Sequence, residues 1–148
     1  MKLQQFLELF RPLPGNCYLQ VATQEDAITS ALEKLLESVD GELRTAFYNE
    51  QGLDFSKPFR ALPRDHDIVI LQDVLSQHTT PKMLLKIAYT TLANTADIIL
   101  LEKDDAMSKE EMKTLLEEFE FRAINDIDIL EGYNLVMAKK MHMWGNGL

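Results

Sequence analysis

Two patterns of apolar residues alternate along this chain and predict its secondary structure. Short, nearly continuous apolar runs predict buried strands at residues 17–22, 43–48, 67–73, 96–101, 121–129 and 133–141, and a shorter run at 59–62 fits a further strand. Apolar residues spaced three and four apart predict helices over 2–10, 24–40, 81–94 and 109–119. We therefore expect an α/β fold: a three-layer sandwich with a mostly parallel sheet between helices. The last two strands flank a tight connection, so one antiparallel C-terminal strand should complete the sheet.

Capping residues predict where the helices begin. Thr23 can cap the second helix, with Asp26 at its third position, in a relative of the capping box. Pro81 is expected at the first position of the third helix. Ser108 and Glu111 form a capping box for the fourth. In the third helix the residues expected to face inward are Met83, Leu84, Ile87, Ala88, Thr91 and Leu92.

The length of 148 residues predicts a single domain over 1–148. Residues 1–14 would form a helical N-terminal extension, which either packs on the chain's own sheet or pairs with a second copy; we favour the first. Residues 49–58 are expected to be a loop or one turn. Residues 142–148 are expected to form a flexible tail.

Charge and composition exclude several classes of function. The formal net charge is −9, and the 15 Lys and Arg residues are scattered along the sequence without a basic stripe. Binding to nucleic acid or to an anionic membrane surface normally needs clustered cations, so neither is expected. The single cysteine, Cys17, rules out an internal disulfide framework. No membrane span or signal peptide is evident, which makes a cytoplasmic location the default expectation.

Few residues suggest a metal site or a nucleophile. His66 lies between Asp65 and Asp67, but the other histidines are not at ligand spacing from it, so no metal is expected. Cys17 is better explained as a small buried side chain. The carboxylates of 102–112 lack the spacing of a calcium loop and are expected to be solvated.

The second half of the chain resembles the class I S-adenosylmethionine-dependent methyltransferases. "HDIVILQDVL" (66–75) looks like the family's fourth strand, and "MLLKIAYTTLANTADIILLEK" (83–103) like the following helix and fifth strand. "LLEEFEFRAINDIDILEGYNLVMAKK" (115–140) looks like its last helix, sixth strand and antiparallel seventh strand. The resemblance covers roughly 16–140 and implies a Rossmann-like fold with S-adenosylmethionine as the cofactor.

The family's most specific motif is changed in this chain. After the first strand the family has an acidic residue and then three glycines, and these positions fall on Gln20, Ala22, Gln24 and Asp26. Glycine lets backbone approach a ligand closely, so a Cβ at all three positions would displace the cofactor or straighten the turn. Gln20 lacks the negative charge of the family's acid, and Asp26 is placed to satisfy helix N–H groups instead. We therefore expect that this loop no longer acts as a standard cofactor loop.

The resemblance also implies where other cofactor contacts would lie. Glu50 is close to the position of the family's ribose-binding acid, although a solvated loop carboxylate is the simpler explanation. Gln72 and Asp73 follow the fourth strand, where open α/β sheets bind ligands, but they could instead hydrogen-bond the loop before Pro81, as could Ser76 and His78.

Two functions follow from these patterns. The first is a methyltransferase-like domain that has lost standard S-adenosylmethionine binding and serves as an interaction or structural module, with a protein partner or through self-association. The second is an active methyltransferase with an atypical loop. In that case Gln20, Ala22 and Thr23 would line the methionine part, Glu50 would hold the ribose, and Gln72 and Asp73 would border the transfer site.

Overall fold

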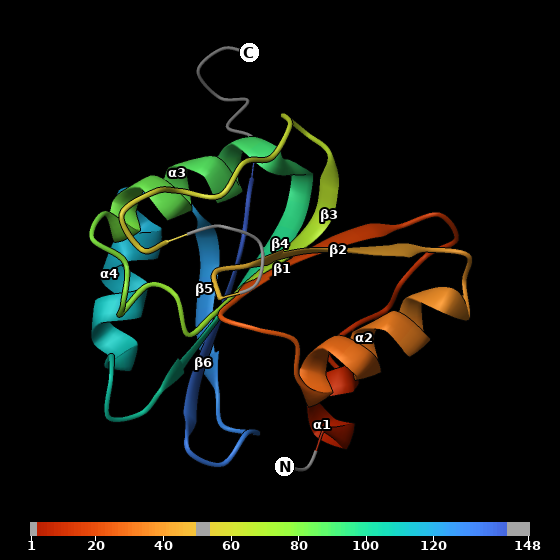
Figure 1. Cartoon of the computed structure of the whole chain (residues 1–148), viewed down its shortest axis with the longest axis horizontal. Helices are drawn as coiled ribbons and strands as arrows, with labels where there is room; N and C mark the ends of the chain where they lie inside the picture. Colours follow the sequence, from red (N-terminus) through yellow and green to blue (C-terminus); the bar gives the residue numbers. More distant parts are fainter. Residues whose placement is uncertain (1–2, 50–53, 142–148) are drawn as a thin grey trace.

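A computed structural model describes residues 3–49 and 54–141, and within these ranges six strands form one sheet (Figure 1). The strands are β1 (Cys17–Ala22), β2 (Glu42–Phe47), β3 (His66–Gln72), β4 (Leu92–Lys103), β5 (Arg122–Ile127) and β6 (Tyr133–Lys139). Their order across the sheet is β2-β1-β3-β4-β6-β5. The first four are parallel, and β6 runs antiparallel to both β4 and β5. The predicted α/β sandwich with an antiparallel C-terminal strand is confirmed.

Helices cover both faces of this sheet (Figure 1). One layer holds α1 (Gln4–Leu7) and α2 (Ala27–Glu37), and the other holds α3 (Pro81–Thr91) and α4 (Lys109–Glu118). Alternate strand residues point to opposite faces, so Leu19 and Val21 join the core beside α3 and α4, while Tyr18 joins the core beside α1 and α2. Burial on both faces explains why the central strands are continuous apolar runs.

The residues at which the helices begin agree only in part with those predicted from the sequence. The prediction that Thr23 caps the second helix is wrong. Asp26 is the N-cap, because its carboxylate accepts hydrogen bonds from the backbone N–H groups of Ile28 and Thr29 at 3.0 and 3.2 Å. The capping box of Ser108 and Glu111 is confirmed.

The predicted strand at 59–62 is not formed, which leaves β2 as an edge strand of the described sheet. Prolines at 58 and 63 flank this segment and lack the N–H group that a ladder needs. Phe59 is instead buried in the core on the α3 side of the sheet. The segment therefore crosses the helical layer and does not extend the sheet.

The third helix is shorter than predicted, but it turns nearly the predicted face inward, because Leu84, Ala88 and Thr91 are buried and Ile87 packs against the core. It ends at Thr91, because Leu92 already pairs with His66 at the start of β4. Leu85 is buried, whereas Met83, which was expected to face inward, is 43% exposed.

The N-terminal helix is also shorter than predicted, but residues 3–10 do pack on the chain's own sheet. Phe10 lies between Phe6 and Tyr18 of β1, with ring centroids 5.1 and 5.7 Å away. The longest described helices have 11 residues, and no helix in the described part of the chain has the length and apolar character of a membrane span. The predicted tail, 142–148, lies outside the described residues.

Candidate functional site

The carboxyl ends of β1 and β3 meet at one edge of the sheet, because these strands are parallel neighbours with Val21 opposite Leu71. This edge brings together five of the six residues that the sequence proposed as cofactor contacts: Gln20, Ala22, Thr23, Gln72 and Asp73. The sixth, Glu50, lies outside the described residues.

A chain of side-chain hydrogen bonds crosses this edge. The Gln20 amide Nε2 donates to Gln72 Oε1 at 2.8 Å, and the Gln72 amide Nε2 donates to the Asp26 carboxylate at 2.6 Å. Gln20 and Gln72 are both buried. A carboxylate only accepts, so Gln72 must direct its amino group toward Asp26 and its oxygen toward Gln20, which fixes both amide orientations. These bonds connect β1, β3 and the start of α2.

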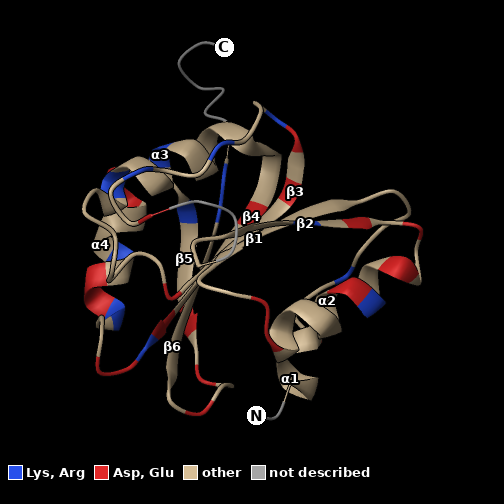
Figure 2. Ribbon diagram, in the orientation of Figure 1, with Lys and Arg blue, Asp and Glu red and all other residues tan. Residues whose placement is uncertain are grey.

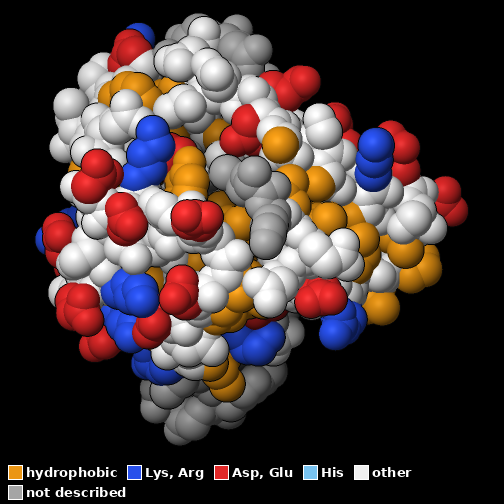
Figure 3. Space-filling model, turned by 90° about the horizontal axis from the view of Figure 1, so that it is seen from below, with side chains coloured by type: hydrophobic (Ala, Val, Ile, Leu, Met, Phe, Trp, Pro, Cys, Tyr) orange, Lys and Arg blue, Asp and Glu red, His pale blue; other side chains and the backbone are white. Residues whose placement is uncertain are grey.

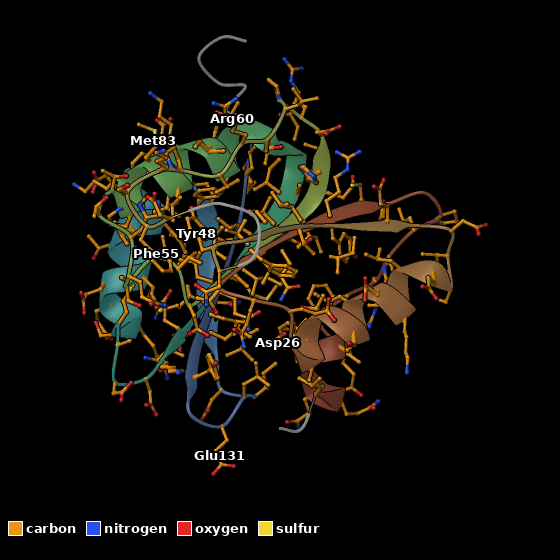
Figure 4. The ribbon with its side chains drawn as sticks, in the orientation of Figure 1. Asp26, Tyr48, Phe55, Arg60, Met83 and Glu131 are labelled. Carbon is orange, nitrogen blue, oxygen red and sulfur yellow. The ribbon has the colours of Figure 1, made fainter. Side chains whose placement is uncertain are left out.

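Asp26 therefore has two roles at once. One carboxylate oxygen caps α2 and the other accepts the Gln72 amide, while the backbone N–H of Asp26 donates to the Thr29 hydroxyl at 3.1 Å. Figure 4 shows Asp26 at the turn that leads into α2. An uncapped helix N-terminus is a ready site for an anionic ligand group. Here the Asp26 carboxylate already occupies N–H groups of the first turn.

One atom of this network has no partner among the described residues. The Gln20 Oε1 oxygen is buried and accepts no hydrogen bond. A buried unpaired acceptor costs about 1–3 kcal/mol, so it is a place where a donor from a ligand would gain free energy. It is the one feature of this network that still favours a ligand.

The position of the Asp73 side chain is set by its backbone conformation and by Tyr133. Its φ of 58° lies in the left-handed region, which Asp adopts more readily than most residues. The Tyr133 hydroxyl donates to its carboxylate at 3.0 Å. Burial raises the pKa of Asp73, and the Tyr133 hydrogen bond partly opposes this. Burial, together with Asp73, raises the pKa of Tyr133 to about 12, so the phenol remains a donor at neutral pH.

The prediction that Glu102 is a solvated loop carboxylate is wrong. It is fully buried at the end of β4, and its carboxylate accepts the backbone N–H of Leu75 at 3.1 Å. Burial raises the pKa of Glu102, and contacts with Ser76 and Leu75 lower it in part. Its position immediately after the apolar run 96–101 was the signal that placed it at the ligand-binding edge.

Replacing Glu102 with Gln should make the protein more stable than wild type near neutral pH. With a raised pKa in the folded state, Glu102 contributes stability below its ordinary pKa of 4.5 and loses it as the pH rises. The Gln side chain has no such dependence, so the difference should grow with pH to about 1–3 kcal/mol. Urea unfolding across this pH range measures it, with the exposed Glu117→Gln as control. A difference that stays constant with pH would contradict this account of Glu102.

Aromatic side chains pack where β2 ends. The rings of Tyr48 and Phe55 stack with centroids 4.8 Å apart, as Figure 4 illustrates, and His78 meets both edge-on. His78 donates from Nε2 to the Lys57 carbonyl at 2.9 Å and accepts the Thr80 N–H at Nδ1 at 3.0 Å. Both ring nitrogens are therefore used in holding two loops together.

His66 and Cys17, the residues considered as a metal ligand and as a nucleophile, are explained by their places in the fold. His66 is buried, and burial lowers its pKa, while its Nδ1 bonds the Thr91 hydroxyl at 2.8 Å. Burial raises the pKa of Cys17, which keeps it as a thiol. Within 3–49 and 54–141, no group of three or more His, Cys, Asp or Glu side chains could hold a metal ion.

Comparison with known proteins identifies the fold. No protein-family model matches the sequence, and neither does any curated protein. A SAM-dependent methyltransferase from Aquifex aeolicus is similar in structure, with a TM-score of 0.73 and 14% identity, over 93% of this chain and 89% of that one. Phosphoethanolamine N-methyltransferase 2 from Haemonchus contortus, solved with S-adenosyl-L-methionine, gives 0.71 at 8% identity, over 93% of this chain and 51% of that one.

A third similar structure has a protein partner. The putative methyltransferase from Haloferax volcanii, in complex with the Trm112 methyltransferase activator, gives a TM-score of 0.66 at 11% identity, over 94% of this chain and 88% of that one. The chain therefore has the class I methyltransferase fold, as the sequence resemblance implied. At these identities the similarity shows the fold alone.

The segment after β1 carries side chains where the family resemblance implies glycines, at Ala22, Gln24 and Asp26. The hydrogen bond from the Gln72 amide to the Asp26 carboxylate also joins the end of β3 to the start of α2.

Proposed function

We propose that this chain is a methyltransferase-fold domain that no longer binds S-adenosylmethionine in the standard way and works as an interaction module. The observation that carries the proposal is the hydrogen-bond chain from Gln20 through Gln72 to Asp26. These hydrogen bonds tie together the ends of β1 and β3 and the start of α2. The family resemblance implies cofactor contacts at the same three places.

The surroundings of the network support the same conclusion. Asp73 bonds Tyr133, Glu102 bonds the backbone of Leu75, and His78 joins two loops. Each of these side chains makes at least one hydrogen bond within the chain, although Glu102 Oε1, like Gln20 Oε1, is buried without a partner among the described residues. A binding edge would instead keep several of them directed at a ligand.

The alternative is an active methyltransferase with an atypical loop. The unpartnered Gln20 Oε1 favours it, because a buried acceptor could receive a donor from the ligand. In that case Ala22 and Thr23 would border the methionine part, Glu50 would hold the ribose, and Gln72 and Asp73 would flank the transfer site. Binding supplies an already activated sulfonium, so the chain's own contribution would be positioning.

Titration with S-adenosylmethionine and S-adenosylhomocysteine separates the two functions. A ligand present at about 100 times its dissociation constant stabilises the folded state by about 2.7 kcal/mol. We expect no change in thermal unfolding, and no heat of binding by calorimetry, with millimolar ligand. A clear stabilisation by either compound that Glu50→Ala weakens would establish the alternative and overturn the proposal.

A further inference from the structure

An apolar hollow lies on the outer side of α3, away from the carboxyl edge of the sheet. Its volume is about 540 Å³, and its lining residues are Pro58, Phe59, Arg60, Ala61, Leu62 and Ile87. Phe59 is buried, whereas Leu62 is 69% exposed. Met83, one helical turn before Ile87, adds a second exposed apolar side chain, and Figure 4 shows Met83 and Arg60 at different points along α3. Solvent-exposed apolar groups gathered around a hollow are a common mark of an interaction surface.

The rim of this hollow is cationic, although the chain is acidic. Segment 57–64 and helix α3 together carry five cations and no Asp or Glu, in a chain of formal net charge −9: Lys57, Arg60, Arg64, Lys82 and Lys86. Figure 2 shows the basic residues along this segment and on α3. On the face shown in Figure 3, by contrast, basic and acidic side chains are intermixed. The cations remain scattered along the sequence, and the fold brings two separate segments together to build this surface.

Most of these charges have no acidic partner within the described part of the chain. Lys82 pairs with Glu118 at 3.0 Å, but Lys57, Arg60, Arg64 and Lys86 form no ion pair with another described residue. Lys140 lies near Arg64, and its pKa is lowered by burial and then by that guanidinium. Lys57 also interacts electrostatically with Asp54, so neighbouring carboxylates neutralise the positive potential here only in part, and least around Arg60 and Lys86.

We propose that this hollow and its cationic rim form the docking site for an acidic amphipathic peptide segment of a partner protein. Apolar side chains of that segment would enter the hollow between Phe59, Leu62 and Ile87. Flanking Asp or Glu side chains would meet Arg60 and Lys86. The proposal rests on the interaction-module function only in supposing that this domain acts through a partner, and it uses a different surface.

Two other kinds of partner, a second copy of the chain and a nucleic acid, fit the chemistry of this hollow less well. A second copy could offer the acidic helix α4, but Met112 and Leu116 of that helix are fully buried in its own core, and Leu115 packs against the same core. Nucleic acid would satisfy the cations and leave the exposed Leu62 and Met83 unpaired with apolar groups. An acidic peptide with apolar anchors satisfies both features.

The test uses a fluorescein-labelled synthetic peptide in which Leu and Phe, one helical turn apart, are flanked by Glu residues. Fluorescence anisotropy measures its binding to the whole chain. We expect saturable binding that the Arg60→Glu/Lys86→Glu double variant weakens about tenfold or more, roughly 1.4 kcal/mol. Lys34→Glu, an exposed cation on α2 in the opposite layer, should leave affinity unchanged. Leu62→Ser should weaken binding independently of charge.

Three outcomes would overturn the proposal. They are no binding at about 1 mM peptide, equal affinity for a peptide with Gln in place of Glu, and displacement of the peptide by a single-stranded oligonucleotide of higher affinity. Thermal unfolding of each variant confirms that it is folded. Because titration with S-adenosylhomocysteine tests a separate edge of the sheet, failure here is distinguishable from failure of the proposed function.

Discussion

Replacing Asp26 with Ala is expected to lower the free energy of unfolding by about 2–4 kcal/mol. The substitution removes the N-cap of α2, which is worth about 0.5–2 kcal/mol. It also leaves the buried Gln72 amide without its acceptor, at a cost of about 1–3 kcal/mol. Equilibrium urea unfolding, followed by circular dichroism, measures the change.

Two further variants show which role of Asp26 matters. Gln24→Ala changes an exposed neighbour in the same loop and should stay within about 0.5 kcal/mol of wild type. Asp26→Asn keeps an oxygen for the cap but opposes an amino group to Gln72 Nε2, so its loss should be intermediate. If Asp26→Ala destabilised no more than Gln24→Ala, the network would not stabilise this edge of the sheet.

Replacing Gln72 with Leu should cost a similar amount, about 2–4 kcal/mol. The change leaves the Gln20 amide unsatisfied in the core and removes one donor from the Asp26 carboxylate. The Gln20→Leu/Gln72→Leu double variant should recover part of the loss, because removing both buried partners leaves fewer unpaired groups than removing one. A double-mutant cycle from urea unfolding then gives a coupling of about 0.5–3 kcal/mol.

Strict additivity of the two substitutions would mean that the amides do not interact in solution. Gln77→Leu provides the matched control, since Gln77 is exposed and bonds only the backbone of Asp73 on its own loop. Its effect should stay within about 0.5 kcal/mol.

Sequence periodicity predicted the layers of this fold well because each element is long enough to show its buried face. The runs 17–22 and 67–73 are covered by helices on both sides, and each forms a strand. Tertiary contacts decided the rest. Segment 59–62 has the composition of a strand, but prolines on both sides keep it out of the sheet, and Phe59 anchors it in the helical layer.

The candidate site was predictable as a set of residues and not as a network. The order of the strands placed Gln20 and Gln72 at one edge, and the missing glycines indicated that the loop had changed. The hydrogen bond from Gln72 to Asp26 joins residues 46 positions apart, and no local pattern specifies it. The burial of Glu102 and the cationic surface around Arg60 likewise depend on which distant segments the fold brings together.

The most direct test of the central claim is a titration of the ¹⁵N-labelled chain with S-adenosylhomocysteine, followed through the backbone amide resonances of Ala22, Thr23 and Gln24. If the hydrogen-bonded side chains close this loop to the cofactor, these resonances should not move with ligand up to about 2 mM. Saturable shifts confined to these amides, with a dissociation constant below about 100 µM, would show that the loop still receives the nucleoside and would contradict the account.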